Sequence, residues 1–77
     1  MDDIKYVVTD YNRTNTMFIF PANVYHSKFA KMFGTPISAG FIDIKNKRCY
    51  GQSTSLKLKS NPKVDNILLG ILLREED

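Results

Sequence analysis

The stretch IKYVVTDYNRTNTMFIF, residues 4–20, decides how this chain of 77 residues begins to fold. Residues 4–11 alternate in character and consist mainly of β-branched and aromatic side chains, which predicts a strand. Residues 12–15 have the composition of a turn, and residues 16–20 resume the alternation as far as Pro21, which cannot donate to a strand ladder. The chain is therefore predicted to begin with a β-hairpin.

After Pro21 the hydrophobic period changes to that of a helix. Apolar side chains recur at i, i+4, i+7 and i+8, namely at Tyr25, Phe29, Met32 and Phe33. Proline is favourable at a helix start, and the Gly-Thr-Pro run at residues 34–36 is typical of a helix end. We predict a first helix here, with His26 off the apolar stripe and therefore at the surface.

Residues 37–44 predict a strand, and the tight loop that follows predicts a second hairpin in which Ile44 pairs with Cys49. The return strand poses a problem of register. If it were unbroken, Leu56 would lie on the face opposite to Cys49. Because glycine and small hydroxyl residues suit a bulge, we expect a break within residues 51–55 that moves the later leucines onto the side of Ile44.

A second helix is predicted near the end of the chain, where Asn61 and Pro62 are typical of an N-cap and a first helical position. Its expected core stripe consists of Val64, Ile67, Leu68, Ile71 and Leu72. Leu69 and Leu73 fall outside this stripe, four residues apart, and form a predicted exposed pair. We expect that pair to be an interface, unless the sheet and the first helix cover the second helix from both sides.

These elements predict an α+β fold with the order ββαββα, in a single small domain that spans residues 1–77. The expected architecture is an antiparallel sheet of about four strands with two helices packed on one face. The predicted core consists of Ile4, Tyr6, Val8, Phe18, Phe20, Phe29, Met32, Ile42, Ile44, Leu56, Ile67, Leu68, Ile71 and Leu72.

The composition excludes several classes of protein. At 43% hydrophobic residues the chain is too apolar for a disordered tail, and it has no apolar run of the roughly 20 residues that span a bilayer. Cys49 is the single cysteine, so no intramolecular disulfide forms, and with one distant histidine it makes no metal site. We expect a cytoplasmic protein with no cofactor, no metal and no membrane contact.

The basic residues are concentrated in one segment that contains no acid. Its six cations are Lys45, Lys47, Arg48, Lys57, Lys59 and Lys63. The rest of the chain has five basic and eight acidic residues, so the net charge of +3 comes entirely from residues 45–63. With Tyr50 as a stacking surface, this segment is a candidate site for nucleic acid or another anion. The alternative is a solvated cationic face that maintains solubility and protects strand edges.

The cations form one patch only if the chain folds back within residues 51–55. A straight strand would separate Arg48 from Lys59 by about 36 Å, at roughly 3.3 Å per residue. A fold-back could also create an anion site from backbone N–H groups and hydroxyls. The start of the last helix, with Ser60, Asn61 and Lys63, is a slightly better candidate anion site, although a capped helix without a ligand is the favoured interpretation there.

No catalytic constellation is evident. Residues 51–55, GQSTS, have half of a nucleophile elbow but lack its closing glycine, and they lack the ending of a phosphate loop. Cys49 is expected to be a small buried hydrophobic residue, and the alternative is a thiol made reactive by Lys47 and Arg48.

The function predicted first is a non-enzymatic protein-binding or adaptor module that self-associates through its C-terminal helix. Weak, salt-dependent nucleic-acid binding through residues 45–63 comes second. A small anion-binding protein or enzyme comes third.

Overall fold

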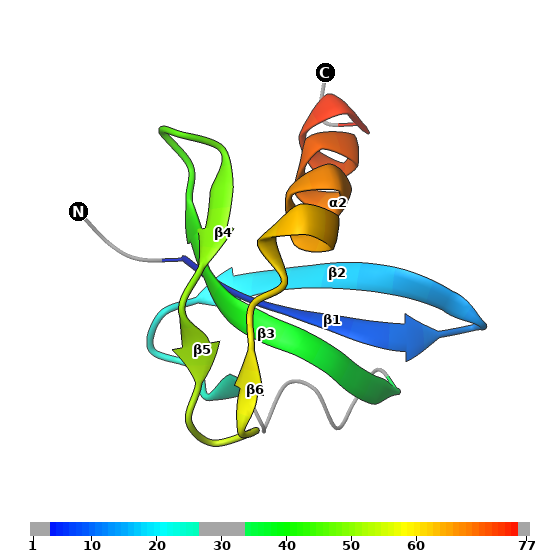
Figure 1. Cartoon of the computed structure of the whole chain (residues 1–77), viewed down its shortest axis with the longest axis vertical. Coiled ribbons are helices and arrows are strands. Elements are labelled where there is room, and N and C mark those ends of the chain that lie inside the picture. Colours follow the sequence, from blue (N-terminus) through cyan, green and yellow to red (C-terminus); the bar gives the residue numbers. More distant parts are fainter. Residues whose placement is uncertain (1–3, 27–33, 76–77) are drawn as a thin grey trace.

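The computed structural model describes residues 4–26 and 34–75. The main sheet has four antiparallel strands in the order β2-β1-β3-β4, and a separate pair, β5 with β6, forms a small second sheet (Figure 1). The elements are β1 (Ile4–Tyr11), β2 (Thr14–Pro21), β3 (Thr35–Asp43), β4 (Arg48–Tyr50), β5 (Gln52–Ser53), β6 (Leu58–Lys59) and the helix α2 (Pro62–Glu75). The α+β class and the four-stranded antiparallel sheet are confirmed.

The first hairpin is also confirmed. β1 and β2 pair along their whole length, from Ile4 with Pro21 to Tyr11 with Thr14. The loop has two residues, Asn12 and Arg13, both at positive φ (52° and 63°). Such a loop matches the right-handed twist of its strands, and asparagine is among the residues that tolerate this conformation best.

The described residues contain one helix, so the predicted order ββαββα is not what the structure shows. Between β2 and β3 the described chain makes a turn closed by the Val24 amide, which donates to the Pro21 carbonyl at 3.1 Å. The first predicted helix, with Phe29, Met32 and Phe33 on its stripe, lies largely outside the described residues.

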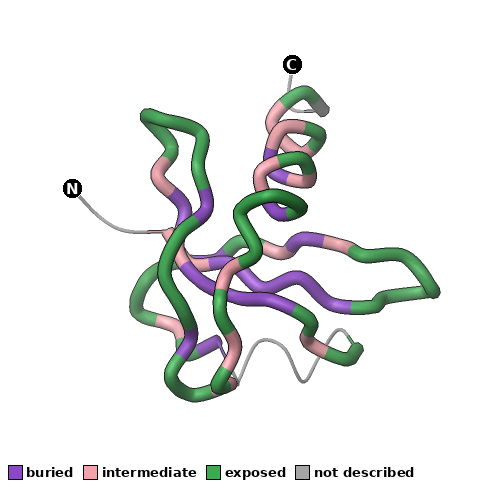
Figure 2. Tube along the Cα trace, in the orientation of Figure 1, coloured by how far each residue is buried: buried purple, intermediate pink, exposed green. Residues whose placement is uncertain are grey.

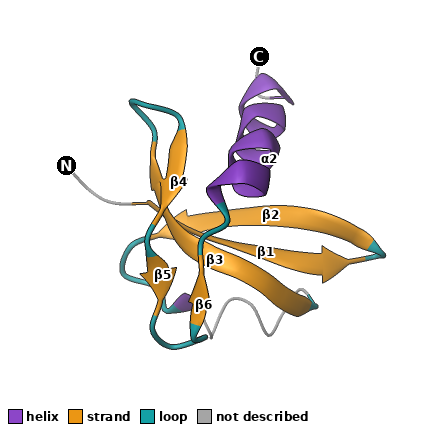
Figure 3. Ribbon diagram, in the orientation of Figure 1, coloured by secondary structure: helices purple, strands orange, loops and turns teal. Residues whose placement is uncertain are grey.

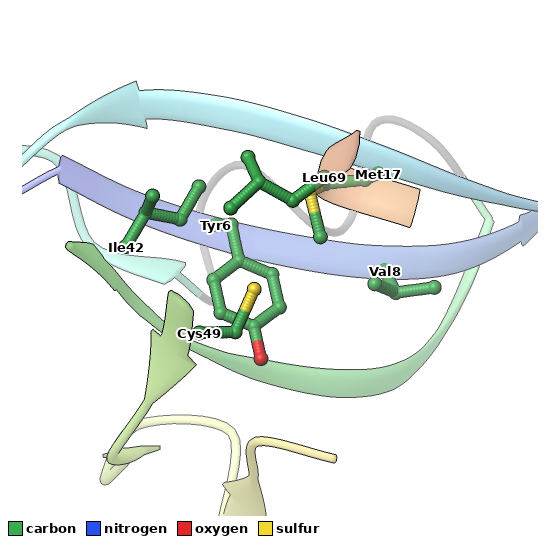
Figure 4. Packing of buried hydrophobic residues seen from close by; sticks show 6 residues of the cluster. All are labelled: Tyr6, Val8, Met17, Ile42, Cys49 and Leu69. Atoms are coloured by element: carbon green, nitrogen blue, oxygen red, sulfur yellow. The ribbon is translucent and has the colours of Figure 1, made fainter. Parts of the chain in front are cut away.

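The sheet buries both of its faces, which differs from the predicted packing of both helices on one face (Figure 1). α2 covers one face, over a cluster that consists of Tyr6, Val8, Met17, Ile42, Cys49 and Leu69 (Figure 4). On the other face, Val7, Phe20 and Ala39 pack against Val24 and against Leu56 and Leu58 of the β5–β6 hairpin. Because β1 is buried on both sides, Val7 belongs to the core as much as its neighbours do.

The register of the β3–β4 hairpin differs from the predicted one by two residues. Ile42, not Ile44, pairs with Cys49. The cause is a longer loop, in which the Asp43 carboxyl accepts hydrogen bonds from the Asn46 amide nitrogen (3.3 Å) and side chain (2.7 Å). Since an Asx turn of this kind replaces strand pairing, Ile44 moves into the loop and is 44% exposed rather than in the core.

The break in the return strand is confirmed, but its consequence was wrongly predicted. Gly51 has a φ of 78°, a left-handed conformation that favours glycine, and it separates β4 from β5. The Ser60 amide donates to the Gly51 carbonyl at 2.9 Å, which brings the two ends of the β5–β6 hairpin together. The hairpin crosses to the face of Val7, so Leu56 and Leu58 pack there and not beside Ile42.

The helix α2 begins at Pro62, directly after Asn61, as the N-cap pattern predicted (Figure 3). In the described part of the chain, neither this helix nor any other is both long and apolar enough to cross a membrane. Its orientation about its own axis differs from the prediction: Leu69 is 1% exposed, whereas Ile67 is 64% and Ile71 48% exposed.

Candidate functional site

A buried carboxyl group fixes the orientation of α2 on the sheet. Asp65, in the first turn of the helix, is 1% exposed. Its oxygens accept hydrogen bonds from the Tyr6 hydroxyl of β1, from the Ser38 hydroxyl of β3 at 2.9 Å, and from the Asn61 backbone amide at 2.8 Å. Asp65 therefore joins two central strands to the start of the helix.

The neighbouring Asn66 adds a second polar link between the helix and the sheet. Its side-chain oxygen accepts a hydrogen bond from the Cys49 backbone amide of β4 at 2.7 Å. Buried polar groups need such partners, because an unpaired one costs about 1–3 kcal/mol. The helix face with Asp65 must therefore lie against the sheet, and Leu69, one turn later, lies in the core (Figure 4).

This orientation leaves an apolar surface on the far side of the helix. We name it the outer face of α2 and define it by Val64, Ile67 and Ile71, which are 40%, 64% and 48% exposed. The three positions are spaced by three and four residues, so they form one continuous strip. The strip adjoins a groove of about 170 Å³ between α2 and β2, lined by Asn15, Thr16, Met17, Leu68, Ile71 and Leu72.

Gly70 lies beside the outer face, three residues after Ile67. A Cβ atom built on Gly70 would meet nothing within 4 Å, so no packing within the described chain requires glycine there. Glycine in a helix interior is about 1 kcal/mol less favourable than alanine. Its absence of a side chain leaves the helix backbone open to close approach from outside.

The interface residues predicted from the sequence need correction. Leu69 belongs to the core, and Leu73 is partly buried and packs against the same core. The apolar surface of the helix is the outer face, and its three residues, Val64, Ile67 and Ile71, all belong to the stripe that was predicted to face the core. The hydrophobic stripe gave the wrong orientation because apolar residues occupy most sides of this helix, and periodicity alone could not select the buried side.

The predicted cations are not brought together. The hairpin tip with Lys45 and Lys47 and the β5–β6 turn with Lys57 lie toward opposite ends of the molecule (Figure 1), and both are exposed (Figure 2). Lys59 in β6 and Lys63 in the first turn of α2 follow Lys57 along the chain. The chain does fold back after Gly51, but the fold-back carries Lys57 away from the hairpin tip.

Tyr50 is 38% exposed, and its ring stacks on that of Phe41, with centroids 5.8 Å apart and planes 28° apart. Arg48, two residues earlier in the same strand, is exposed and pairs with Asp43 across the β3–β4 ladder. Because alternate residues of a strand share a face, Arg48 and Tyr50 lie on the same exposed face of β4.

Cys49 is buried, and its surroundings do not support the hypothesis that Lys47 and Arg48 make its thiol reactive. Burial, followed by the nearby Asp65 carboxyl, raises the pKa of Cys49 from 9.0 to about 11. Lys47 and Arg48 are exposed on the loop and at the start of the strand, where their charges do not offset burial. Burial and the hydrogen bond to Asp65 raise the pKa of Tyr6 well above its ordinary value of 10.0.

His26, predicted at the surface, is 4% exposed. Its Nε2 atom lies 2.8 Å from the Gly40 carbonyl, which can only accept, so this nitrogen carries the proton. The imidazole meets the Phe20 and Phe41 rings edge to face, at centroid distances of 5.4 and 5.8 Å. Burial, more than the nearby Lys5 charge, lowers the pKa of His26 below 6.5.

Sequence reasoning missed Asp65 and the outer face of α2. One signal was available: an acid four residues after an N-cap asparagine resembles a capping box, in which the side chain reaches back to the N-cap amide. In this structure the Asp65 carboxyl turns back to the Asn61 amide and is buried.

Within residues 4–26 and 34–75, no group of three or more histidine, cysteine or acidic side chains could hold a metal ion. Comparison of the chain with models of protein families, with curated proteins and with solved structures gives no significant match. The site therefore rests on its own geometry: a helix held to an α+β domain by buried polar contacts, with an apolar strip directed outward.

Proposed function

We propose that the protein is a non-enzymatic protein-binding module that self-associates through the outer face of α2. The observation that carries this proposal is the exposure of Val64, Ile67 and Ile71 in one strip on a helix whose other side is already anchored. A contiguous apolar strip on a small domain is typical of an interface, whereas scattered apolar side chains are not.

A second copy is the occupant that fits this face best. A twofold dimer places the same patch on both sides, so an apolar strip meets an apolar strip without any need for complementary charge. Small domains also gain stability through association, because their cores are limited.

The size of the face sets the expected affinity. A helix of 14 residues is about 21 Å long, at roughly 1.5 Å per residue, and about 10 Å across. One face of it covers roughly 200 Å², well below the roughly 800 Å² per partner of a standard interface. The contact therefore has to include the groove beside Met17 and Leu68. We expect a dimer that dissociates on dilution rather than an obligate one.

The mass in solution tests the proposal. Sedimentation equilibrium over a hundredfold range of concentration should show a reversible monomer–dimer equilibrium for the wild type. Ile67→Lys and Ile71→Lys should each weaken the dimer by about tenfold or more, because a lysine would lose its hydration at the centre of the contact.

Ile37→Lys is the matched control. Ile37 is 46% exposed, close to the 48% of Ile71, but it lies on β3, away from the outer face of α2. This variant should keep the dimer. A wild type that stays monomeric throughout, or a control that dissociates as readily as Ile67→Lys, would contradict self-association through α2.

Nucleic-acid binding, the second prediction from the sequence, has less support from the geometry. It would have to rely on the hairpin tip, with Lys45, Lys47 and Arg48, because Lys57 lies toward the other end of the molecule. Phosphate-driven affinity falls steeply with salt and grows with the number of phosphates neutralised, so three cations provide a weak site.

A further inference from the structure

A half-open pocket lies on the side of the sheet opposite to α2, between the segment after β2 and the β5–β6 hairpin. Its volume is about 230 Å³, and its lining includes Lys5, Tyr25, His26, Phe41, Gln52, Thr54 and Ser55. For comparison, an apolar cavity of roughly 150 Å³ accommodates benzene. The pocket therefore has room for one aromatic ring with a small polar substituent.

The described lining of this pocket contains one cation and no acid. Lys5 donates from Nζ to the Val24 carbonyl at 2.9 Å, which holds the ammonium group at the pocket and leaves two of its three N–H donors. Nζ also lies 5.7 Å from the centroid of the Tyr25 ring. Further donors come from the Gln52 amide and from the Thr54 and Ser55 hydroxyls.

Phe41 and His26 form part of the pocket lining, and contacts with neighbouring residues hold both rings in place. The Phe41 ring stacks on the Tyr50 ring and meets the His26 imidazole in a T-shaped contact, with the two planes 89° apart. His26 is in turn fixed by its hydrogen bond to Gly40. Gly51 permits this arrangement, because a Cβ atom there would lie 3.0 Å from the Phe41 ring.

We propose that this pocket binds a small aromatic oxyanion, an aryl carboxylate or an aryl phosphate, with its charged group at Lys5 and its ring against Phe41. The ammonium group and the hydroxyl donors of residues 54–55 match an oxyanion, and charge-assisted hydrogen bonds are roughly twice as strong as neutral ones. The Phe41 ring matches a flat apolar body. The site is separate from the outer face of α2 and does not depend on self-association.

The test is a titration of the wild-type protein with four probes, followed through backbone amide chemical shifts. Benzoate and phenyl phosphate represent the two oxyanions, benzyl alcohol provides a neutral aromatic, and inorganic phosphate provides an anion without a ring. One or both aromatic anions should produce saturable shifts at Gln52, Thr54 and Ser55, with little change at residues 44–47. Benzyl alcohol and inorganic phosphate should bind about tenfold more weakly or worse.

Lys5→Met keeps most of the aliphatic stem and removes the charge. It should therefore lower the affinity for the aromatic anion by about tenfold or more. Lys45→Met, which removes a lysine from the hairpin tip, is the matched control and should bind as the wild type does. If Lys5→Met does not fold, the comparison of the four probes on the wild type still tests whether the pocket prefers an aromatic anion. Absence of saturable binding, equal binding of benzyl alcohol and benzoate, or full affinity in Lys5→Met would overturn the proposal.

Discussion

At the scale of single residues, the buried side chain of Asp65 links the sheet to the helix. It is the point at which β1, β3 and the start of α2 are joined by hydrogen bonds. In a low-dielectric surrounding, such a satisfied network specifies one arrangement of the elements, because any other leaves a polar group unpaired. The orientation of α2, and with it the outer face, follows from this one side chain.

We predict that Asp65→Ala lowers the free energy of unfolding by about 3 kcal/mol, since it leaves Tyr6 and Ser38 as buried donors without their acceptor. Asp65→Asn should cost less, because one oxygen remains to accept. Urea denaturation followed by circular dichroism measures both. Asp10→Ala, at an exposed end of β1, is the control and should change little; equal losses in the two alanine variants would contradict the role of Asp65.

Stability should also fall at alkaline pH. The Cys49 thiol has a pKa of 9.0 in an unfolded chain and about 11 in the folded protein, so the folded state holds this proton more tightly. Between pH 9 and 11 the folded state binds more protons than the unfolded state, and the free energy of unfolding therefore decreases as pH rises. Tyr6, whose pKa is also raised, extends the loss above pH 10.

Urea unfolding at pH 7, 9 and 10.5 measures this effect. Cys49→Ala should be less sensitive between pH 9 and 10.5, because only the Tyr6 contribution remains. At pH 7 the wild-type thiol should react slowly with a thiol reagent and rapidly after unfolding. Fast reaction of the folded protein at pH 7 would show that the thiol is accessible and would contradict the burial argument.

At the scale of elements, the positions of α2 and of the strands were predicted better than their orientations. The helix begins at Pro62 as expected, since an N-cap pattern is local in sequence. The predicted rotation of the helix about its axis was wrong because the hydrophobic stripe is ambiguous. The helix has seven large apolar residues, namely Val64, Ile67, Leu68, Leu69, Ile71, Leu72 and Leu73. With apolar residues on most sides of a helix, periodicity alone cannot select the buried side.

Gly70→Ala should have opposite effects on the stability of the monomer and on the affinity of the proposed dimer. In the monomer the new methyl group meets nothing within 4 Å, so the helix should gain up to about 1 kcal/mol from its higher propensity. If a second copy packs closely over Gly70, the same methyl group should weaken the dimer. Urea denaturation below the dissociation constant measures the first effect, and sedimentation equilibrium measures the second.

A variant in which both stability and dimer affinity rise would place the contact away from Gly70. Loss of stability at low concentration would show that the space beside Gly70 is occupied within the monomer. Neither outcome agrees with close helix approach at this position, so the variant tests the geometry of the contact as well as its existence.

At the scale of the whole molecule, sequence clusters and spatial clusters differ. Residues 45–63 carry all of the excess positive charge, but the β3–β4 loop and the β5–β6 hairpin direct their tips toward opposite ends (Figure 1). Conversely, Lys5, Phe41 and Ser55 are far apart in sequence and line one pocket. The candidate ligand site was invisible in the sequence because four separate segments contribute to it.

The sequence by itself determined the features that depend on neighbouring residues. These are the α+β class, the first hairpin, the N-cap of the last helix and the break near Gly51, each set by turn chemistry, capping or local period. Only the tertiary structure decided which face each element buries. That choice depends on contacts such as Asp65 with Tyr6 and Ser38, which join residues 59 and 27 positions apart. Patterns of neighbouring residues do not predict such long-range contacts, and both proposed sites depend on contacts of this kind.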